Sequence, residues 1–282
     1  MERLTDTERK EIQAKYPNLE FPDPVTEPIW YGKRPTTRID GSKAIVDQKT
    51  DSVFGICSDL YQVIHYEDIV RMVEKTVANL PEFGKIEVVP TIIQEGRKMK
   101  IKATMTEVEY EIRKGDVVNP MITIRTSYDL GWKLSGIFGA LRLICTNGAT
   151  VGKTFSRFAK RHLTSLDPSD LTKSIQGGMG IYSEQVGLWK EWAQMKLDTA
   201  TYDAVWEALP FSENEKEKIE KLSEVSTKHT LADKEWRKEA TLWDFHSVVT
   251  QFATHEIKSE VRRADVEPMI AKAFDLGYSR LH

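Results

Sequence analysis

The stretch "KIEVVPTIIQEGRKMKIKATMTEVEYEI" (residues 85–112) contains two apolar runs with a turn between them at residues 95–97. In the second run, methionine, isoleucine and alanine alternate with lysine and threonine. This is the two-residue period of a strand that is buried on one side. Lys98, Lys100 and Lys102 then share the other side. The stretch therefore predicts a β-hairpin with a basic outer face.

Further strands are predicted on both sides of this hairpin. After it, residues 119–128 and 132–147 are apolar runs separated by a turn signal. The connections are too short for crossover helices, so we expect an antiparallel sheet. Before it, short strands are expected at residues 53–57 and 61–64. The apolar spacing of residues 67–80 predicts an amphipathic helix.

The N-terminal residues differ in character from the rest of the chain. Residues 5–15 predict a short polar helix. The prolines that crowd together after it favour extended backbone, because each proline fixes its own φ and restricts the residue before it. We expect Trp30 and Tyr31 to anchor this extended arm against the domain or a neighbouring subunit.

The C-terminal part is predicted to be mostly helical from Lys153 onward. The "GGMG" sequence at 177–180 predicts a flexible break, and Ser212 with Glu215 has the spacing of a capping box. The expected helices lie at residues 181–198, 202–209, 213–226, 241–257 and 265–276.

Together these patterns predict an α+β fold, in which a curved antiparallel sheet packs on helices and a mostly helical C-terminal region follows. The predicted parts are a Pro-rich extended N-terminal arm at 1–48, a β-sheet core with helices at 49–180, and a helical region packed on the core at 181–282.

Charge is distributed unevenly, although the net charge of the 282 residues is only −3. Residues 96–161 carry 13 lysines and arginines against 5 acidic residues, and residues 182–282 carry 14 against 19. A basic middle favours a polyanionic partner, while ordinary surface variation is the alternative. The charged N-terminus and the short apolar runs predict a soluble cytoplasmic protein without a signal peptide or membrane span. Cys57 and Cys145 are expected to be reduced.

The segment from Asn147 to Thr154 resembles a phosphate-binding loop that ends in Gly-Lys-Thr. Gly148 is followed by three residues before Gly152, one fewer than the loop requires, and the position that should hold its first glycine is Asn147. The strands before it are predicted to be antiparallel, and no apolar strand ending in Asp follows. We therefore expect a strand, a turn and a helix start, without nucleotide hydrolysis.

Basic residues of the hairpin, the later strands and the first helix after the sheet are the candidate nucleic-acid-binding residues. Residues 153, 157, 160 and 161 have a spacing that would put them on one face of the predicted helix. The hairpin and this helix face would then form a groove that binds a phosphate backbone. The candidates are Arg97, Lys98, Lys100, Lys102, Lys133, Arg142, Lys153, Arg157, Lys160 and Arg161. Tyr128, Trp132, Phe155 and Phe158 are candidates for base stacking, with core packing as the alternative.

The sequence contains no pattern that indicates a catalytic or metal site. His246 and His255 are nine residues apart on a predicted helix, which places them on different sides of it. No GxSxG sequence is present. We predict a protein that is not an enzyme and that binds no cofactor and no metal.

Three stretches together resemble the phage/plasmid-like domain-of-unknown-function family number nine-three-two. They are "VFGICSDLYQVIHYEDIVRMVE" (53–74), "ITIRTSYDLGWKLSGIFGALRLICTNGA" (122–149) and "TLWDFHSVVTQFATHEIK" (241–258). The matching positions are Ser127, Asp129, Gly131, Arg142, Cys145, Asn147, Leu242, Trp243, Thr250 and Phe252. The resemblance covers about residues 50 to 275, and Leu130 is an insertion into the Asp-Gly turn.

The resemblance implies a phage-encoded protein in the cytoplasm of a host cell. The order of sheet and basic helix is also similar, more remotely, to single-strand annealing recombination proteins, which are oligomeric and hold single-stranded DNA without hydrolysing nucleotides. This implies single-stranded DNA as the partner and self-association into a homo-oligomer. The alternative is a protein-interaction module of a phage, such as an inhibitor of a host defence system, whose acidic C-terminal third contacts a host or phage protein.

Overall fold

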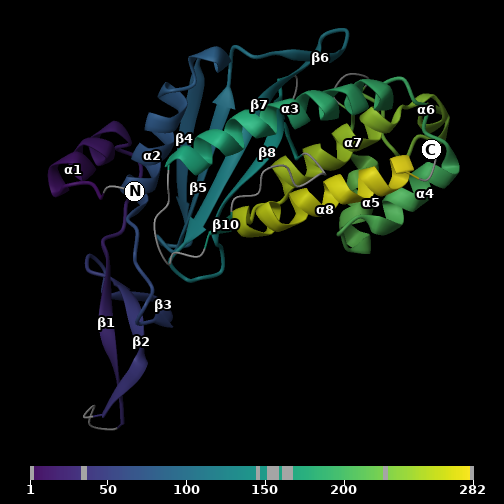
Figure 1. Ribbon diagram of the computed structural model, residues 1–282. Coiled ribbons are helices and arrows are strands. Elements are labelled where there is room, and N and C mark those ends of the chain that lie inside the picture. Colours follow the sequence, from purple (N-terminus) through teal and green to yellow (C-terminus); the bar gives the residue numbers. More distant parts are fainter. Residues whose placement is uncertain are drawn as a thin grey trace. The chain divides into compact units, whose positions relative to one another are not determined.

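The computed structural model describes residues 3–32, 37–143, 147–150, 159–160, 168–224 and 228–279 (Figure 1). The chain divides into two compact units, each assembled from separate segments. The first unit comprises Met1–Ala103, Ile122–Gly136 and Ser156–Gln176, and the second comprises Thr104–Met121, Ile137–Phe155 and Gly177–His282. Each unit is therefore built from segments that are far apart in the sequence.

Two helices of the first unit pack side by side. α1 (Asp6–Lys15) begins with a capping box formed by Thr5 and Glu8, which confirms the predicted polar helix. α2 (Tyr66–Ala78) confirms the predicted amphipathic helix, because its apolar face is buried and packs on β4. Polar side chains join the two helices; for example, Gln13 Nε2 of α1 donates to Glu67 Oε1 of α2 over 2.6 Å.

The predicted arm is a three-stranded antiparallel sheet, which we call the arm sheet. It consists of β1 (Pro24–Tyr31), β2 (Thr37–Asp47) and β3 (Ser52–Ser58), in the order β1-β2-β3. Two prolines, Pro24 and Pro28, lie in β1, which has β2 as its one neighbour among the described strands. An edge strand tolerates proline because one of its sides needs no amide donor.

The short strand predicted at residues 61–64 is absent, since this stretch has irregular structure. Tyr61 N bonds back to Ser58 O over 3.0 Å, which turns the chain at the end of β3. Further along, Ile64 O accepts a hydrogen bond from the Tyr128 hydroxyl at 3.0 Å. The backbone groups of this stretch thus form hydrogen bonds within a turn and with the Tyr128 side chain, where a strand would bond to a neighbouring strand.

Within the described residues the main sheet has seven strands in the order β10-β8-β7-β5-β4, with β6 paired to β7 and β9 paired to β8. The strands are β4 (Ile86–Ile93), β5 (Lys98–Met105), β6 (Tyr110–Arg113), β7 (Asp116–Ser127), β8 (Leu134–Arg142), β9 (Asn147–Thr150) and β10 (Ala159–Lys160). Pairs β6/β7, β8/β9 and β8/β10 are antiparallel, which agrees with the prediction. With the helices described here, the fold is α+β.

The predicted basic outer face of β5 is wrong for two of its lysines. β5 lies between β7 and β4, and seven of its eight residues are buried. Lys98 and Lys100 are 6% and 7% exposed, whereas Lys102 is half-buried. The alternation correctly predicted a strand, but a sequence period cannot show whether the second face of that strand is also covered.

The helix predicted from Lys153 is contradicted where the structure describes it. Residues Ala159 and Lys160 form β10, paired with Ser135 and Leu134 of β8. The flexible break predicted at 177–180 is also absent, because α3 (Pro168–Trp192) continues through it. Ile175 and Tyr182 of α3 are buried, and this packing outweighs the cost of about 1 kcal/mol for each helical glycine.

The helices of the second unit enclose an aromatic core. They are the part of α3 from Gly177 onward, α4 (Thr199–Ala208), α5 (Glu213–Lys221), α6 (Lys234–Glu239), α7 (Leu242–Gln251), a π-helical turn (Phe252–Glu256) and α8 (Glu260–Ser279). Trp189, Trp192, Trp243, Phe245 and Phe274 are all at most 2% exposed. The predicted helical C-terminal region is therefore confirmed.

Candidate nucleic-acid interface

The lysines of β5 lie beside a tightly bonded turn that follows β7. Lys98, Lys100 and Lys102 share one face of the strand because successive side chains alternate. The Lys98 ammonium pairs with the Asp129 carboxylate. Although burial alone would raise the pKa of Asp129, hydrogen bonds, the one from Lys98 first, hold that pKa below its usual value. Asp129 therefore stays ionised and fixes the position of Lys98.

Backbone and side-chain hydrogen bonds define the conformation of this turn. Ser127 Oγ accepts from Trp132 N at 2.8 Å, and Asp129 Oδ1 accepts from Gly131 N at 2.9 Å. Leu130 has a φ of +62°, in the left-handed region. The left-handed conformation of Leu130 accommodates the residue inserted into the Asp-Gly turn. The hydrogen bond to Ser127 holds the backbone of Trp132 in place.

Two cations lie over the indole ring of Trp132. Lys98 Nζ is 5.5 Å and Arg125 Cζ is 5.6 Å from the ring centroid. The ring is half-buried, and Lys133 beside it is exposed. We call Lys98, Arg125, Asp129 and Trp132 the Trp132 platform. All four belong to the first unit.

Sequence reasoning found part of this site. It proposed Lys98 as a cation and Trp132 as a stacking residue, and it associated Asp129 with the family. It missed Arg125. The signal was present, because Thr123 and Arg125 alternate with the apolar, buried Ile122 and Ile124 of the same strand.

Other sequence candidates of the first unit differ in how far they reach the surface. Arg97 is half-buried in the β4–β5 turn, where its carbonyl accepts from Tyr128 N at 2.8 Å. Lys133 is exposed and Lys102 half-buried, so both reach the surface. Tyr128 is fully buried and stacks between Phe54 and Tyr66, with centroid distances of 5.6 and 4.2 Å. Of the stacking candidates, Tyr128 is therefore a core residue.

The candidate Arg142 is not available to a nucleic acid, because it is 2% exposed in the second unit. Its guanidinium forms a two-pronged pair with Asp116, in which Nε donates to Oδ1 over 2.6 Å. Trp243 Nε1 donates to the same carboxylate over 2.8 Å. Two residues of the family resemblance, Arg142 and Trp243, thus converge on one buried aspartate.

Further charges complete this buried network. Glu224 Oε1 is 3.6 Å from Arg142 Nη2 and 3.7 Å from Arg113 Nη2. Arg113 Nη1 also donates to Asp244 Oδ1 over 2.6 Å. Buried charges of this kind are tolerated only when they are paired and hydrogen-bonded. The network accordingly holds β7, β8 and α7 in one arrangement, and we assign it a structural role.

His246 lies next to this network without joining it. Its ring stacks on Trp243 at 5.3 Å and meets Phe274 edge-on at 4.9 Å. Burial, and secondarily the charge of Arg142, lowers its pKa from 6.5 to about 3. The imidazole is therefore neutral at physiological pH and packs as an aromatic residue.

The remaining basic candidates fall largely outside the described residues. Lys153, Arg157 and Arg161 lie there, as do Phe155, Phe158 and Cys145. Lys160 belongs to β10, so the predicted four-residue helix face is not formed as proposed. Asn147 and Gly148, which open the phosphate-loop-like segment, are in β9 and pair with Arg142 and Leu141. Such a hairpin differs from the strand–loop–helix layout of a phosphate loop.

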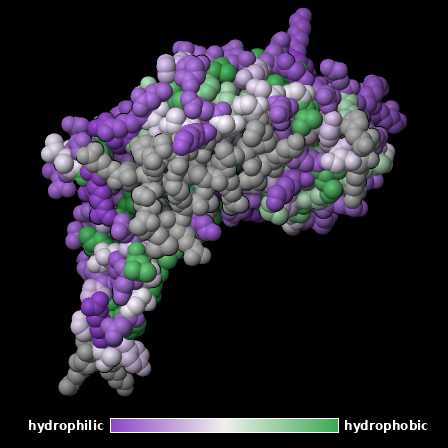
Figure 2. Space-filling view, viewed as in Figure 1, coloured by the Kyte–Doolittle hydropathy of each residue, from purple (hydrophilic) through white to green (hydrophobic). Residues whose placement is uncertain are grey.

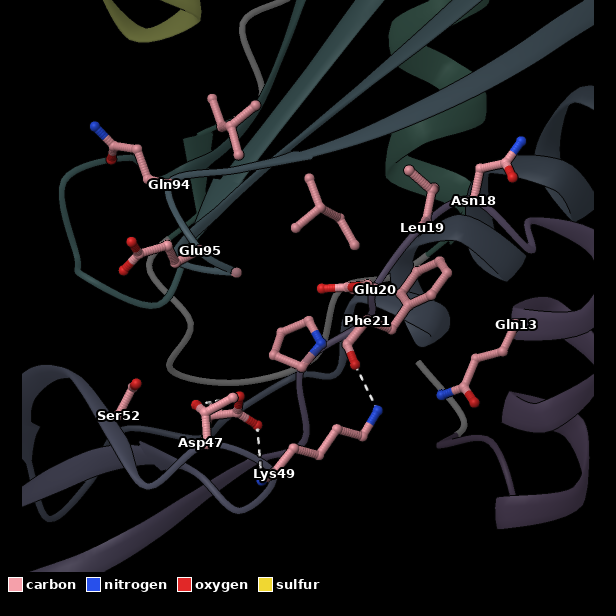
Figure 3. Close-up of a pocket in the computed structure, with 15 residues that line it drawn as sticks. Gln13, Asn18, Leu19, Glu20, Phe21, Asp47, Lys49, Ser52, Gln94 and Glu95 are labelled. Carbon is pink, nitrogen blue, oxygen red and sulfur yellow. Dashed lines mark hydrogen bonds between the residues drawn. The ribbon is translucent and has the colours of Figure 1, made fainter.

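A separate hollow of about 840 Å³ lies in the first unit (Figure 3). The chain between α1 and β1, the β2–β3 turn and the β4–β5 turn line it. Lys49 Nζ donates to Phe21 O over 2.6 Å, and Asp47 accepts from Asp23 N at 2.8 Å and Thr50 Oγ1 at 2.8 Å. These hydrogen bonds hold the β2–β3 turn in place. The Lys49 ammonium is bonded to a backbone carbonyl in this arrangement.

Within the described residues, no group of three or more histidine, cysteine or acidic side chains is arranged to hold a metal ion. None of the helices that the structure describes has the length and hydropathy of a bilayer span.

A family model described as "Domain of unknown function (DUF932)" matches residues 53–273. The chain belongs to this family. The DUF932 match runs from β3 into α8, and it includes both the Trp132 platform and the Arg142 network. It begins after β1 and β2. Neither the curated proteins nor the solved structures include a match to the chain.

Proposed function

We propose that this protein binds single-stranded nucleic acid at the Trp132 platform. The supporting observation is an indole ring flanked by Lys98 and Arg125, each within 6 Å of its centroid. Proteins that bind single strands combine aromatic rings, on which bases stack, with cations that follow the phosphates. The further proposal is that the protein is phage-encoded and acts in recombination, as in strand annealing, without nucleotide hydrolysis.

Burial divides the cations of this surface into two roles. Lys98 and Lys100 are more than 90% buried, so they would not meet phosphate oxygens, and Lys98 instead contacts the Trp132 ring. Arg97, Lys102, Arg125 and Lys133 are half-buried or exposed and would meet phosphate oxygens. Each base stacked on an aromatic ring contributes about 1–3 kcal/mol, which is enough for Trp132 to dominate the affinity.

The direct test is anisotropy of a fluorescent single strand at low salt with Trp132→Ala and Trp132→Phe. We expect the alanine variant to lose at least about fivefold in affinity and the phenylalanine variant to retain most of it. Lys133→Glu should also weaken binding, whereas Lys190→Glu, a charge reversal on exposed surface of α3, should not. Absence of binding by the unmodified protein would exclude the proposed function.

A further inference from the structure

Two exposed aromatic side chains lie near the end of the β1–β2 hairpin. Trp30 is 51% exposed and Tyr31 is 72% exposed, and they are the two aromatic residues among the exposed large hydrophobics of the described chain. Figure 2 shows hydrophobic surface over the arm sheet, next to hydrophilic surface. Rings of this size stabilise a protein when they are buried, so their exposure points to a partner that covers them.

The register of the hairpin decides which side chain accompanies each ring. Trp30 lies directly opposite Arg38, and Tyr31 lies opposite Thr37. Directly opposed residues of an antiparallel pair share a face, and successive residues of a strand alternate between faces. Trp30 and Arg38 therefore form one surface, which we call the Trp30 knob, while Tyr31 belongs to the other face.

The described charges near the knob do not select a polyanion, because Glu27 and Asp40 offset Arg38 and Lys43. A tryptophan with an arginine beside it is instead typical of protein–protein contacts, in which tryptophan, tyrosine and arginine carry most of the binding free energy. The knob therefore suits a protein partner.

The hollow of about 840 Å³ in the same unit has properties complementary to the knob (Figure 3). Its apolar wall consists of Leu19, Phe21, Pro22, Ile92 and Ile93. Glu20 and Glu95 also line it and are exposed, and no ion pair joins either of them to another described residue. In all, three acidic residues and one lysine line the hollow. The hollow therefore suits an apolar ring that has a cation beside it.

The knob does not reach the hollow of its own chain. Pro22 lines the hollow, and β1 begins two residues later at Pro24. Trp30 is six residues further along β1, which is about 20 Å at the usual rise of a strand. Pairing with β2 on both sides of the bulge near Pro28 keeps β1 extended. A knob that enters a hollow therefore comes from another molecule.

We propose that the Trp30 knob of one molecule docks in the hollow of a second copy of this chain. The indole ring of Trp30 covers the apolar wall, and the Arg38 guanidinium meets the carboxylates of Glu20 and Glu95. Knob and hollow are different surfaces, so the contact is heterologous. It builds a closed ring or an open chain, unless two copies exchange knobs reciprocally. The contact does not require nucleic acid, so it is independent of the proposed function.

The test is sedimentation velocity of the full chain without nucleic acid, over about 1–100 μM protein. The mass of the unmodified protein should rise with concentration. The knob variant, Trp30→Ala, and the hollow variant, Glu20→Lys with Glu95→Lys, should each weaken association at least about tenfold.

Two controls match these variants. Tyr31→Ala removes an exposed ring from the other face of the hairpin. Glu109→Lys with Glu207→Lys makes the same charge change at two exposed positions of the second unit. Both controls should associate like the unmodified protein.

A mixture of the two variants gives the sharpest result. The knob variant keeps its hollow and the hollow variant keeps its knob, so together they should form a complex of two chains although neither associates alone. The docking is overturned if the unmodified protein stays monomeric over this range, if the hollow variant associates normally, or if the mixture forms no complex. The proposed function is judged separately, by whether a single strand binds through Trp132.

Discussion

At the scale of single residues, burial and ion pairing decide which basic side chains a ligand can reach. Lys98 and Arg142 were equivalent candidates in the sequence, because each is a cation in an apolar strand. In the structure Lys98 lies over the half-buried ring of Trp132, while Arg142 is enclosed with Asp116 and Glu224. Both have acidic partners, but Asp129 pairs with Lys98 beside the half-buried Trp132, whereas Asp116 and Glu224 enclose Arg142. The depth of enclosure depends on distant parts of the chain, which no local pattern reveals.

His246 provides a prediction at this scale. The folded chain protonates it only near pH 3, whereas an unfolded chain does so near pH 6.5, so the unfolded state binds more protons between these values. Its contribution to the free energy of unfolding is complete above pH 6.5 and declines below it, by up to about 1.4 kcal/mol per pH unit. Urea denaturation across this range should show the decline.

The matched variant for this measurement is His246→Gln, which does not titrate. Its stability should depend less on pH than that of the unmodified protein, even if it is lower throughout. The difference between the two slopes also removes the contribution of His65, whose pKa is lowered by burial in the same direction. Equal slopes would show that His246 does not titrate as described.

At the scale of elements, close approach between helices decides which glycines are required. α4 and α8 pack together at Gly277, where a Cβ atom would lie 2.3 Å from Val205 Cγ2. Val205 is fully buried, and a valine in a helix strongly prefers one χ1 rotamer, so the methyl group cannot easily rotate away. The glycine therefore sets the distance between the two helices.

Gly277→Ala should destabilise the protein by about 1–3 kcal/mol, as overpacking typically does. Gly187→Ala in α3 is the control, because no atom lies within 4 Å of its added Cβ. Alanine is a better helix former than glycine, so this control should be neutral or stabilising by up to about 1 kcal/mol. Thermal and urea denaturation measure both; a neutral Gly277→Ala would contradict the tight packing of α4 on α8.

The sequence predicted individual helices and strands more reliably than the packing around them. The period of Met99, Ile101 and Ala103 identified β5, and the spacing of α2 identified its buried face, because both follow from local side-chain direction. The coverage of the lysine face of β5 and the strand at Lys160 depend on chain segments remote in sequence. The continuous helix through Gly177 and Gly180 likewise depends on packing by its neighbours.

At the scale of the whole molecule, charge restricts how a nucleic acid can bind. The net charge is −3 and the isoelectric point about 6.1, so the protein as a whole repels a polyanion at neutral pH. Binding must then rely on local clusters. The sequence could locate a basic segment, but it could not divide the cations into buried and accessible ones, which is the information that defines the Trp132 platform.

This localisation predicts a modest salt dependence. With Arg97, Lys102, Arg125 and Lys133 as the phosphate contacts, the logarithm of the single-strand affinity should fall with the logarithm of salt concentration with a slope of about −2 to −3. Removing one cation in Lys133→Gln should make the slope shallower by about 0.7. Anisotropy titrations over a series of salt concentrations give both values, and a slope near zero would contradict phosphate contacts.

The prolines of the sheet edges have a consequence for solubility. β1 carries Pro24 and Pro28, and β4, the last strand of the main sheet, carries Pro90. A strand from another molecule that tried to extend either edge would find amide donors missing at these points. Strand addition at these two edges is therefore disfavoured where the prolines lie.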